Sequence, residues 1–236
     1  MPLLKRKRKY PTVKRTKTDK RTGRKIVVSE RPSVREQIER WPRIRTHEMV
    51  WGKDIGGELV PVAREENRER RSVKVDEEKA KKFGSVVHNH QFRLYHLLRR
   101  RGKAYPTIHD LRRLVERFKV GKTTSETVAS LSFSGKVQGY TVVSLKGVEK
   151  PKEQIEKEFN RFLGTEKGLF TRFELTPKGI AVVYISPFSS VELMHAYVEG
   201  LEEIGFRFKH VAMPDYRFDK RKGRFVKKRR KKKKKK

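Results

Sequence analysis

The sequence predicts an α+β protein with a strongly basic segment at each end. Stretches with apolar residues three or four positions apart, typical of helices, alternate with short stretches of alternating apolar and polar residues, typical of strands. Of the 236 residues only 34% are hydrophobic and 38% are charged, so the apolar core is small for this length. The formal charge of +34 arises from 62 Lys and Arg against 28 Asp and Glu, and it predicts a polyanionic partner.

Both ends of the chain are predicted to be disordered basic tails. Residues 1–25 hold twelve Lys or Arg and one Asp, and residues 217–236 hold fifteen and one. Like charges repel and these segments offer little apolar surface to bury, so neither is expected to fold alone. Their expected partner is nucleic acid, whose phosphates the lysines and arginines neutralise. A tail that only aids solubility is the alternative interpretation.

Residues 26–83 are predicted to form an extended connector with a few short elements. A short helix is expected from Ser33, whose hydroxyl is placed to cap it, with Glu36 three residues later as in a capping box. Residues 50–62 contain Gly56-Gly57 between apolar pairs, which is typical of a β-hairpin.

Residues 84–140 are predicted to hold three helices followed by a strand. Apolar residues in the first two segments have helical spacing, and Thr107 has the position of a helix N-cap. Ser134-Gly135-Lys136 then turns the chain into a segment of alternating polarity. The predicted helices cover residues 86–100, 107–118 and 124–133, and the predicted strand covers residues 137–145.

The stretch from Thr107 to Leu131, with its short link at residues 119–122, resembles a winged helix-turn-helix DNA-binding domain. The resemblance implies that the third helix enters the major groove while its neighbours contact phosphates. Eleven basic against three acidic residues over 84–136 agree with this, and a generic three-helix packing unit is the alternative. The residues expected to contact nucleic acid are Arg99, Arg100, Arg101, Arg112, Arg113, Lys119, Lys122, Thr123, Ser125, Thr127, Lys136 and Gln138.

Residues 137–216 show the order strand, helix, strand, strand, helix, strand, which resembles a ferredoxin-like fold. Ten basic and eleven acidic residues leave this part almost neutral, which argues against a nucleic-acid-binding sheet. It also lacks the aromatic and basic strand motif of RNA-recognition domains. We therefore expect a scaffold or self-association module. The predicted fold class is thus α+β, with a winged-helix-like unit at 84–140, a ferredoxin-like α/β sandwich at 137–216 and disordered basic tails.

The sequence shows none of the usual catalytic motifs, and it predicts a non-enzyme without a metal or cofactor. Cysteine is absent, and so are a glycine-rich phosphate loop, a nucleophilic serine motif and a run of paired carboxylates. His88-Asn89-His90 is the one spacing that suits a metal, and it resembles the His-x-His of rolling-circle nicking enzymes. No third ligand stands out nearby. Two surface or phosphate-contacting histidines are therefore the favoured interpretation.

The predicted function is double-stranded DNA binding, largely independent of sequence, for coating, compacting or packaging DNA. Three Asn and four Gln beside abundant Lys, Arg and Glu suggest a hyperthermophile or one of its viruses. A ribosomal or other ribonucleoprotein component that binds structured RNA is the alternative, and a transcription regulator is the second. No apolar run is long enough to span a membrane, and no secretory signal is evident. The expected location is intracellular with DNA, in a nucleoid or virion, or in the ribosome under the alternative.

Overall fold

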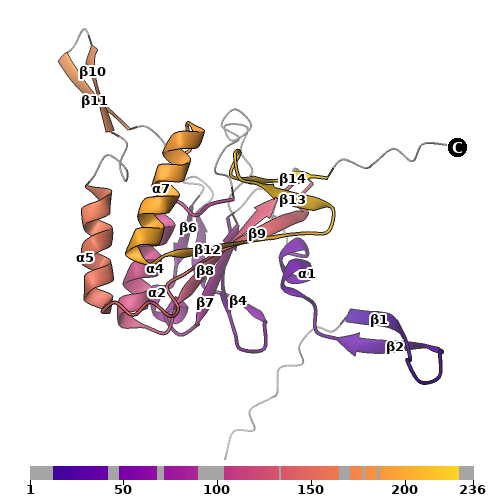
Figure 1. Ribbon diagram of the computed structural model, residues 1–236. Coiled ribbons are helices and arrows are strands. Elements are labelled where there is room, and N and C mark those ends of the chain that lie inside the picture. The colour runs from indigo at the N-terminus through magenta and orange to yellow at the C-terminus, as the bar shows by residue number, and fades with distance from the viewer. Residues whose placement is uncertain are drawn as a thin grey trace, which may run out of the picture.

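A six-stranded mixed sheet forms the centre of the molecule, with the strand order β12-β9-β8-β7-β3-β4 (Figure 1). The computed structural model describes residues 13–41, 48–67, 72–89, 104–132, 134–164, 171–176, 179–184 and 187–228. β7 and β8 are parallel, and the other neighbouring pairs of this sheet are antiparallel. The strands are β3 (Val50–Lys53), β4 (Leu59–Pro61), β7 (Ser85–Asn89), β8 (Ser125–Leu131), β9 (Val137–Ser144) and β12 (Arg207–Ala212).

Three long helices, α4 (Ile108–Val120), α5 (Lys152–Leu163) and α7 (Val191–Ile204), pack side by side along one side of the sheet (Figure 1). Parallel strands need a crossover connection, and α4 lies in the connection between the parallel strands β7 and β8. The apolar stripe of α4, including Leu111 and Leu114, joins Ile155, Leu201 and Val143 in the main buried cluster. This cluster therefore fixes α4 above the middle of the sheet.

A shorter helix, α1 (Val34–Glu39), covers a second apolar cluster formed by the sheet. Its Ile38 is fully buried together with Trp51 and Val87. Successive strand residues point to opposite faces, so Val87 faces α1 while its neighbour Val86 joins a third cluster beside α2 (Glu77–Ala80). His88 shares the face of Val86, which is the face that α2 and α4 cover.

In the described part of the chain, four antiparallel pairs lie outside the central sheet. They form local hairpins between strands that are close in sequence. The pairs are β1 (Val13–Thr18) with β2 (Lys25–Glu30), β5 (Ala63–Asn67) with β6 (Ser72–Val75), β10 (Thr171–Thr176) with β11 (Gly179–Tyr184), and β13 (Tyr216–Asp219) with β14 (Arg224–Lys227).

The local expectations from turns and caps are confirmed. α1 begins at Ser33 with a full capping box to Glu36, and α4 begins at Thr107 with a capping box to Asp110. The segment with Gly56-Gly57 is the turn between β3 and β4. These two strands extend the central sheet, so part of the predicted connector belongs to the core.

The predicted helix over residues 124–133 is wrong: this segment is β8, an inner strand of the sheet. Val128 and Leu131 have helical spacing, but the segment is also rich in Ser, Thr and Val, which suit a pleated strand. Pairing with β7 on one side and β9 on the other decides between the two. The winged-helix resemblance thereby loses its recognition helix. The predicted helix over 86–100 begins as β7, and residues 90–103 lie outside the described part.

The order of elements predicted for residues 137–216 is confirmed, but the four strands do not form one ferredoxin-like sheet. β9 pairs with β12, as expected for the first and last strands of that fold. β10 and β11 pair with each other in a separate hairpin. The other edge of β9 is already taken by β8, so no edge of this strand remains for a further strand.

The prediction of disordered tails is wrong for the parts of both ends that the structure describes. Residues 13–18 form β1, and residues 216–227 form the hairpin of β13 and β14. The C-terminal hairpin folds because it contains two apolar side chains, Phe218 and Phe225, which a count of charges does not register. Phe225 is only 3% exposed. Its ring lies against Gly139 of β9, where a Cβ atom would approach it to 2.5 Å. Residues 1–12 and 229–236 lie outside the described part.

Candidate metal centre

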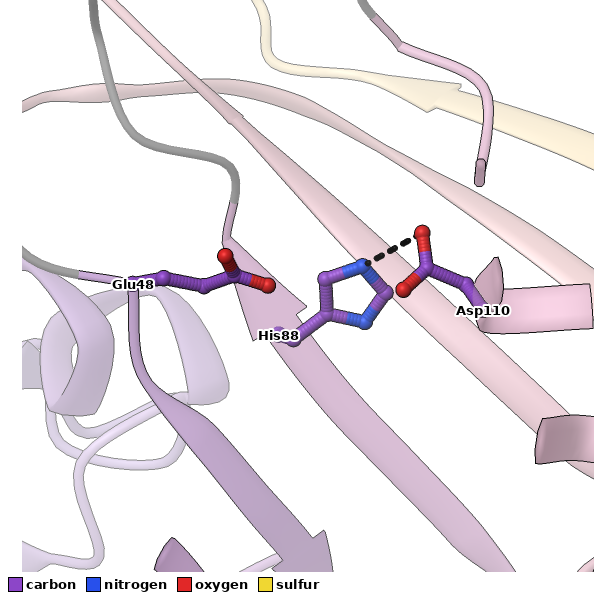
Figure 2. A group of neighbouring side chains, drawn as sticks. All are labelled: Glu48, His88 and Asp110. Atoms are coloured by element: carbon purple, nitrogen blue, oxygen red, sulfur yellow. Dashed lines mark ion pairs between the residues drawn. The ribbon is translucent and has the colours of Figure 1, made fainter. Parts of the chain in front are cut away.

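A buried histidine, His88, lies at the carboxyl end of β7 between carboxylates from other segments (Figure 2). Its Nε2 is 3.6 Å from Oδ2 of Asp110, and its Nδ1 is 3.1 Å from Oε1 of Glu126. His88 is 1% exposed and Glu126 is 3% exposed. Figure 2 shows Glu48 and Asp110 reaching His88 from two sides. One potential ligand atom of each of these three residues lies within 4.8 Å of the others.

The capping box of α4 holds the carboxylate of Asp110 in place. Oδ2 of Asp110 accepts hydrogen bonds from the backbone N–H of Thr107 at 2.7 Å and from its hydroxyl at 2.6 Å. The same oxygen is the one nearest to His88. Asp110 therefore caps the helix and faces the imidazole at once, and both contacts depend on where α4 begins over the sheet.

Backbone contacts between the start of β3 and the end of β7 bring Glu48 to the site. The backbone N–H of Met49 donates to the side-chain Oδ1 of Asn89 at 2.9 Å, and the backbone N–H of Asn89 donates to the Met49 carbonyl at 3.3 Å. Both Met49 and Asn89 are buried. Val50 lies opposite His88 in this antiparallel pair, and Glu48, two residues before Val50, therefore lies on the same face as His88.

Carboxylates of Glu48, Asp110 and Glu126 lie close to His88. Burial lowers the pKa of His88, but the charges and contacts of Asp110 and Glu126 outweigh burial and hold this pKa well above its usual value. The surroundings thus favour a positive charge at this point. A proton on the imidazole supplies one such charge, and a divalent cation bound at Nε2 would supply two.

The donor set fits a divalent transition metal. One imidazole nitrogen and two carboxylate oxygens, with no sulfur, suit Zn²⁺, Mn²⁺ or Fe²⁺. His88, Asp110 and Glu48 would be the protein ligands. Three protein ligands leave coordination positions open, which is the arrangement of catalytic rather than structural metal sites.

Behind His88, a row of charged side chains continues away from the candidate metal position. Arg117 of α4 is 2% exposed, and its Nη1 lies 3.8 Å from Oε2 of Glu126. Its Nε and Nη2 donate to the two carboxylate oxygens of Glu77 at 2.7 and 3.0 Å. Glu77, Arg117, Glu126 and His88 therefore form a row that links α2, α4, β8 and β7.

The structure distributes the residues predicted to contact nucleic acid over several elements rather than one recognition helix. Thr123 is fully buried, and its hydroxyl donates to the carbonyl oxygens of Phe83 and Ala80. Its side chain is therefore a structural contact. Ser125 and Thr127 lie on β8, and Gln138 lies on β9.

The basic residues of that prediction lie mainly on and after α4. Arg112, Lys119, Lys122 and Lys136 are exposed. Lys119 pairs with Glu156 at 2.6 Å. Arg113 is part-buried, with its Nε 3.8 Å from Glu77. The remaining predicted residues, Arg99, Arg100 and Arg101, lie outside the described part of the chain.

Sequence reasoning considered His88 as a ligand and found no partners for it. The partners, Glu48 and Asp110, come from distant segments. One signal was present: an Asp three residues after Thr107 marks a capping box, which fixes its carboxylate at the start of the helix. His90, the other histidine of the predicted pair, lies outside the described residues.

No protein-family model, curated protein or solved structure gave a significant match to this chain. Among the described helices, none combines the length and apolar character needed to cross a bilayer. The fold and the site therefore define the protein only by class, as an α+β protein with a buried histidine and carboxylate cluster at one end of a mixed sheet.

Proposed function

We propose that this protein is a metal-dependent hydrolase that cleaves amide bonds at the His88 cluster. The observation that carries the proposal is the convergence of His88, Asp110 and Glu48 from three segments, with their ligand atoms within 4.8 Å of one another. The sequence predicts a non-enzyme without a metal, and this cluster leads us to the opposite proposal. Carboxylates buried around an imidazole, such as Asp110 and Glu126, need a bound cation or a proton to balance their charge.

The size of the cluster favours one ion and a carbonyl substrate. The three ligand atoms lie within 4.8 Å of one another, a span that suits one ion, whereas enzymes that transfer or hydrolyse phosphate esters commonly place two ions about 3.5–4 Å apart. A single ion with a nearby carboxylate is the arrangement of zinc-dependent peptidases. The geometry therefore supports an amide substrate more than a phosphodiester.

All three residues of the cluster would hold the ion, and one of them would also serve as a base. His88 and Asp110 are the more buried ligands, and Glu48 is the ligand that is only half-buried. A bound divalent ion would lower the pKa of a water molecule and polarise the substrate carbonyl. With an ion and a water molecule bound, the carboxylate of Glu48 would accept a proton of that water and return it to the departing amine.

Metal binding to the full chain is the first test. Chelator-treated protein is titrated with Zn²⁺ and Mn²⁺ by calorimetry, and we expect one ion per chain. His88→Ala and Asp110→Ala should abolish binding. His109→Ala is the matched control, because this histidine is adjacent to Asp110 in sequence but is exposed and is not one of the three residues of the cluster, and it should bind normally. A wild-type chain that binds no divalent cation would refute the proposal and leave His88 as a protonated imidazole that balances its acids.

Activity is the second test. The loaded protein is incubated with a mixture of unfolded proteins and peptides, and cleavage is followed by mass spectrometry. We expect cleavage that stops on addition of chelator. Glu48→Gln should retain at least part of the metal binding and lose cleavage, because an amide cannot accept the proton.

A second proposal concerns the basic charge rather than the cluster. We propose that the protein also binds duplex DNA with little sequence preference, with structured RNA as the alternative partner. The supporting observation is the charge of +34, with exposed Arg112, Lys122 and Lys136 on the described surface. Full-length protein should shift duplex DNA in gels, with affinity falling steeply as salt rises. Replacing Lys231–Lys236 by serine should reduce that salt dependence, and stronger binding to duplex RNA at every salt concentration would favour the alternative.

A further inference from the structure

The carboxylate of Glu126 lies on the far side of the His88 ring from Asp110. Glu126 on β8 is in register with Val86, and His88 is in register with Val128. Glu126 and Val128 share one face of the strand, so the Glu126 side chain reaches His88 diagonally across the parallel pair. A carboxylate in the centre of a sheet, only 3% exposed, is costly to bury unless its contacts compensate for lost hydration.

Two nitrogen-bearing side chains contact Glu126, and the nearer one is His88. Oε1 of Glu126 is 3.1 Å from Nδ1 of His88, whereas Oε2 is 3.8 Å from Nη1 of Arg117. Arg117 instead makes a bidentate pair of hydrogen bonds with the carboxylate of Glu77. If Glu126 served only to neutralise Arg117, the bidentate contact would be expected between Arg117 and Glu126. The geometry therefore places the main role of Glu126 at the imidazole.

We propose that Glu126 is a positioning residue that orients His88 for metal binding. Its Oε1, 3.1 Å from Nδ1, favours the tautomer that carries the hydrogen on Nδ1, and in that tautomer the Nε2 lone pair is available to an ion held with Asp110 and Glu48. A carboxylate on the second ring nitrogen of a metal-binding histidine fixes the ring and strengthens the ligand. Arg117, itself held by Glu77, keeps Glu126 in place from the other side. This inference rests on the proposed metal function of the same cluster.

The test compares metal affinity in variants of Glu126 in the full chain. Zn²⁺ affinity is measured by calorimetry with a competing chelator, and unfolding of each metal-free variant is recorded to confirm that it folds. Glu126→Ala should weaken Zn²⁺ binding about 10- to 100-fold. Glu126→Gln retains an oxygen that accepts the Nδ1 hydrogen, so it should recover most of the affinity. Glu116→Gln removes a charge from the exposed side of α4 and should bind as the wild type does.

A spectroscopic measurement separates positioning from a purely structural role. With Co²⁺ in place of Zn²⁺, the visible absorption bands report the ligand geometry, and they should change in Glu126→Ala but not in Glu116→Gln. If Glu126→Ala does not fold, the double variant Glu126→Leu/Arg117→Met replaces both buried charges with apolar side chains of similar size and carries the same expectation.

The outcomes separate this inference from the proposal on which it rests. A wild-type chain that binds no metal refutes the proposed function. A wild-type chain that binds Zn²⁺, with a folded Glu126→Ala or double variant that binds it equally tightly and with an unchanged Co²⁺ spectrum, refutes the positioning role alone.

Discussion

Replacing Arg117 by methionine tests how strongly the buried charges of the row depend on one another. Methionine has nearly the length of arginine but no charge, so the change removes the cation and leaves the packing of α4 largely intact. Arg117 is 2% exposed, and its loss leaves the buried carboxylate of Glu126 without this counter-charge. The side chain of Glu77 is 39% exposed, so water solvates its carboxylate when Arg117 is removed, and Glu77 contributes little to the loss of stability.

The expected loss of stability follows from these burial values. Removing one partner of a buried ion pair costs about 3–5 kcal/mol when the remaining charge has no other partner, and the contact of Glu126 with His88 at 3.1 Å places the expected loss at the lower end of that range. Lys119 provides the matched control on the same helix. Its ammonium lies 2.6 Å from Glu156, but both side chains are about one-third exposed. An exposed pair of this kind contributes roughly 0–1 kcal/mol.

The measurement is urea unfolding of the metal-free protein, followed by circular dichroism at neutral pH. A chelator is present throughout, because a bound ion would add its own stabilisation. Arg117→Met should lower the free energy of unfolding several-fold more than Lys119→Met does. Equal losses for the two variants would show that Glu126 does not depend on Arg117, and the reasoning about the row would then be wrong.

Two further predictions concern the side of the molecule near the C-terminal hairpin. Burial, together with the charge of Lys220, lowers the pKa of His210 to about 4. The unfolded chain binds this proton at an ordinary pKa of about 6.5, so the stability from neutral His210 is complete above that pH and declines as the pH falls toward 4. Urea unfolding at pH 7 and pH 4.5 should show a loss of about 2 kcal/mol that is absent in His210→Gln; an equal loss in both proteins would contradict this origin. Gly139→Ala should destabilise by about 1–3 kcal/mol in thermal unfolding, because its new Cβ would lie 2.5 Å from the Phe225 ring. Combining it with Phe225→Leu should recover part of that loss, and a wholly additive effect would argue against this contact.

Local features of the fold were predictable because their chemistry is contained in a few consecutive residues. The capping boxes at Ser33 and Thr107 join a side chain to a backbone group three positions away. The turn at Gly56-Gly57 requires a positive φ, which is +80° at Gly57, and glycine adopts it without strain. Such signals are visible in any sequence that contains them.

The strand β8 shows where this reasoning fails. Its apolar residues fit a helix and a strand equally well, and only its two neighbours in the sheet decide the outcome. The same holds for the C-terminal end, where a count of charges hides Phe225. Its burial depends on Gly139, which is distant in sequence. Patterns of neighbouring residues do not show which strands will pair with β8 or that Gly139 will lie against Phe225.

The sequence by itself determined the basic charge, the helix starts and the hairpin turns, since these depend on composition and on contacts within a few residues. Tertiary structure alone decided the candidate metal centre. In the sequence, His88 has no neighbouring ligand residues. The pairing of β3 with β7 brings Glu48 beside it, and the packing of α4 on the sheet brings Asp110 beside it. Each of these contacts joins segments far apart in the chain, and sheet pairing and core packing are what bring them together.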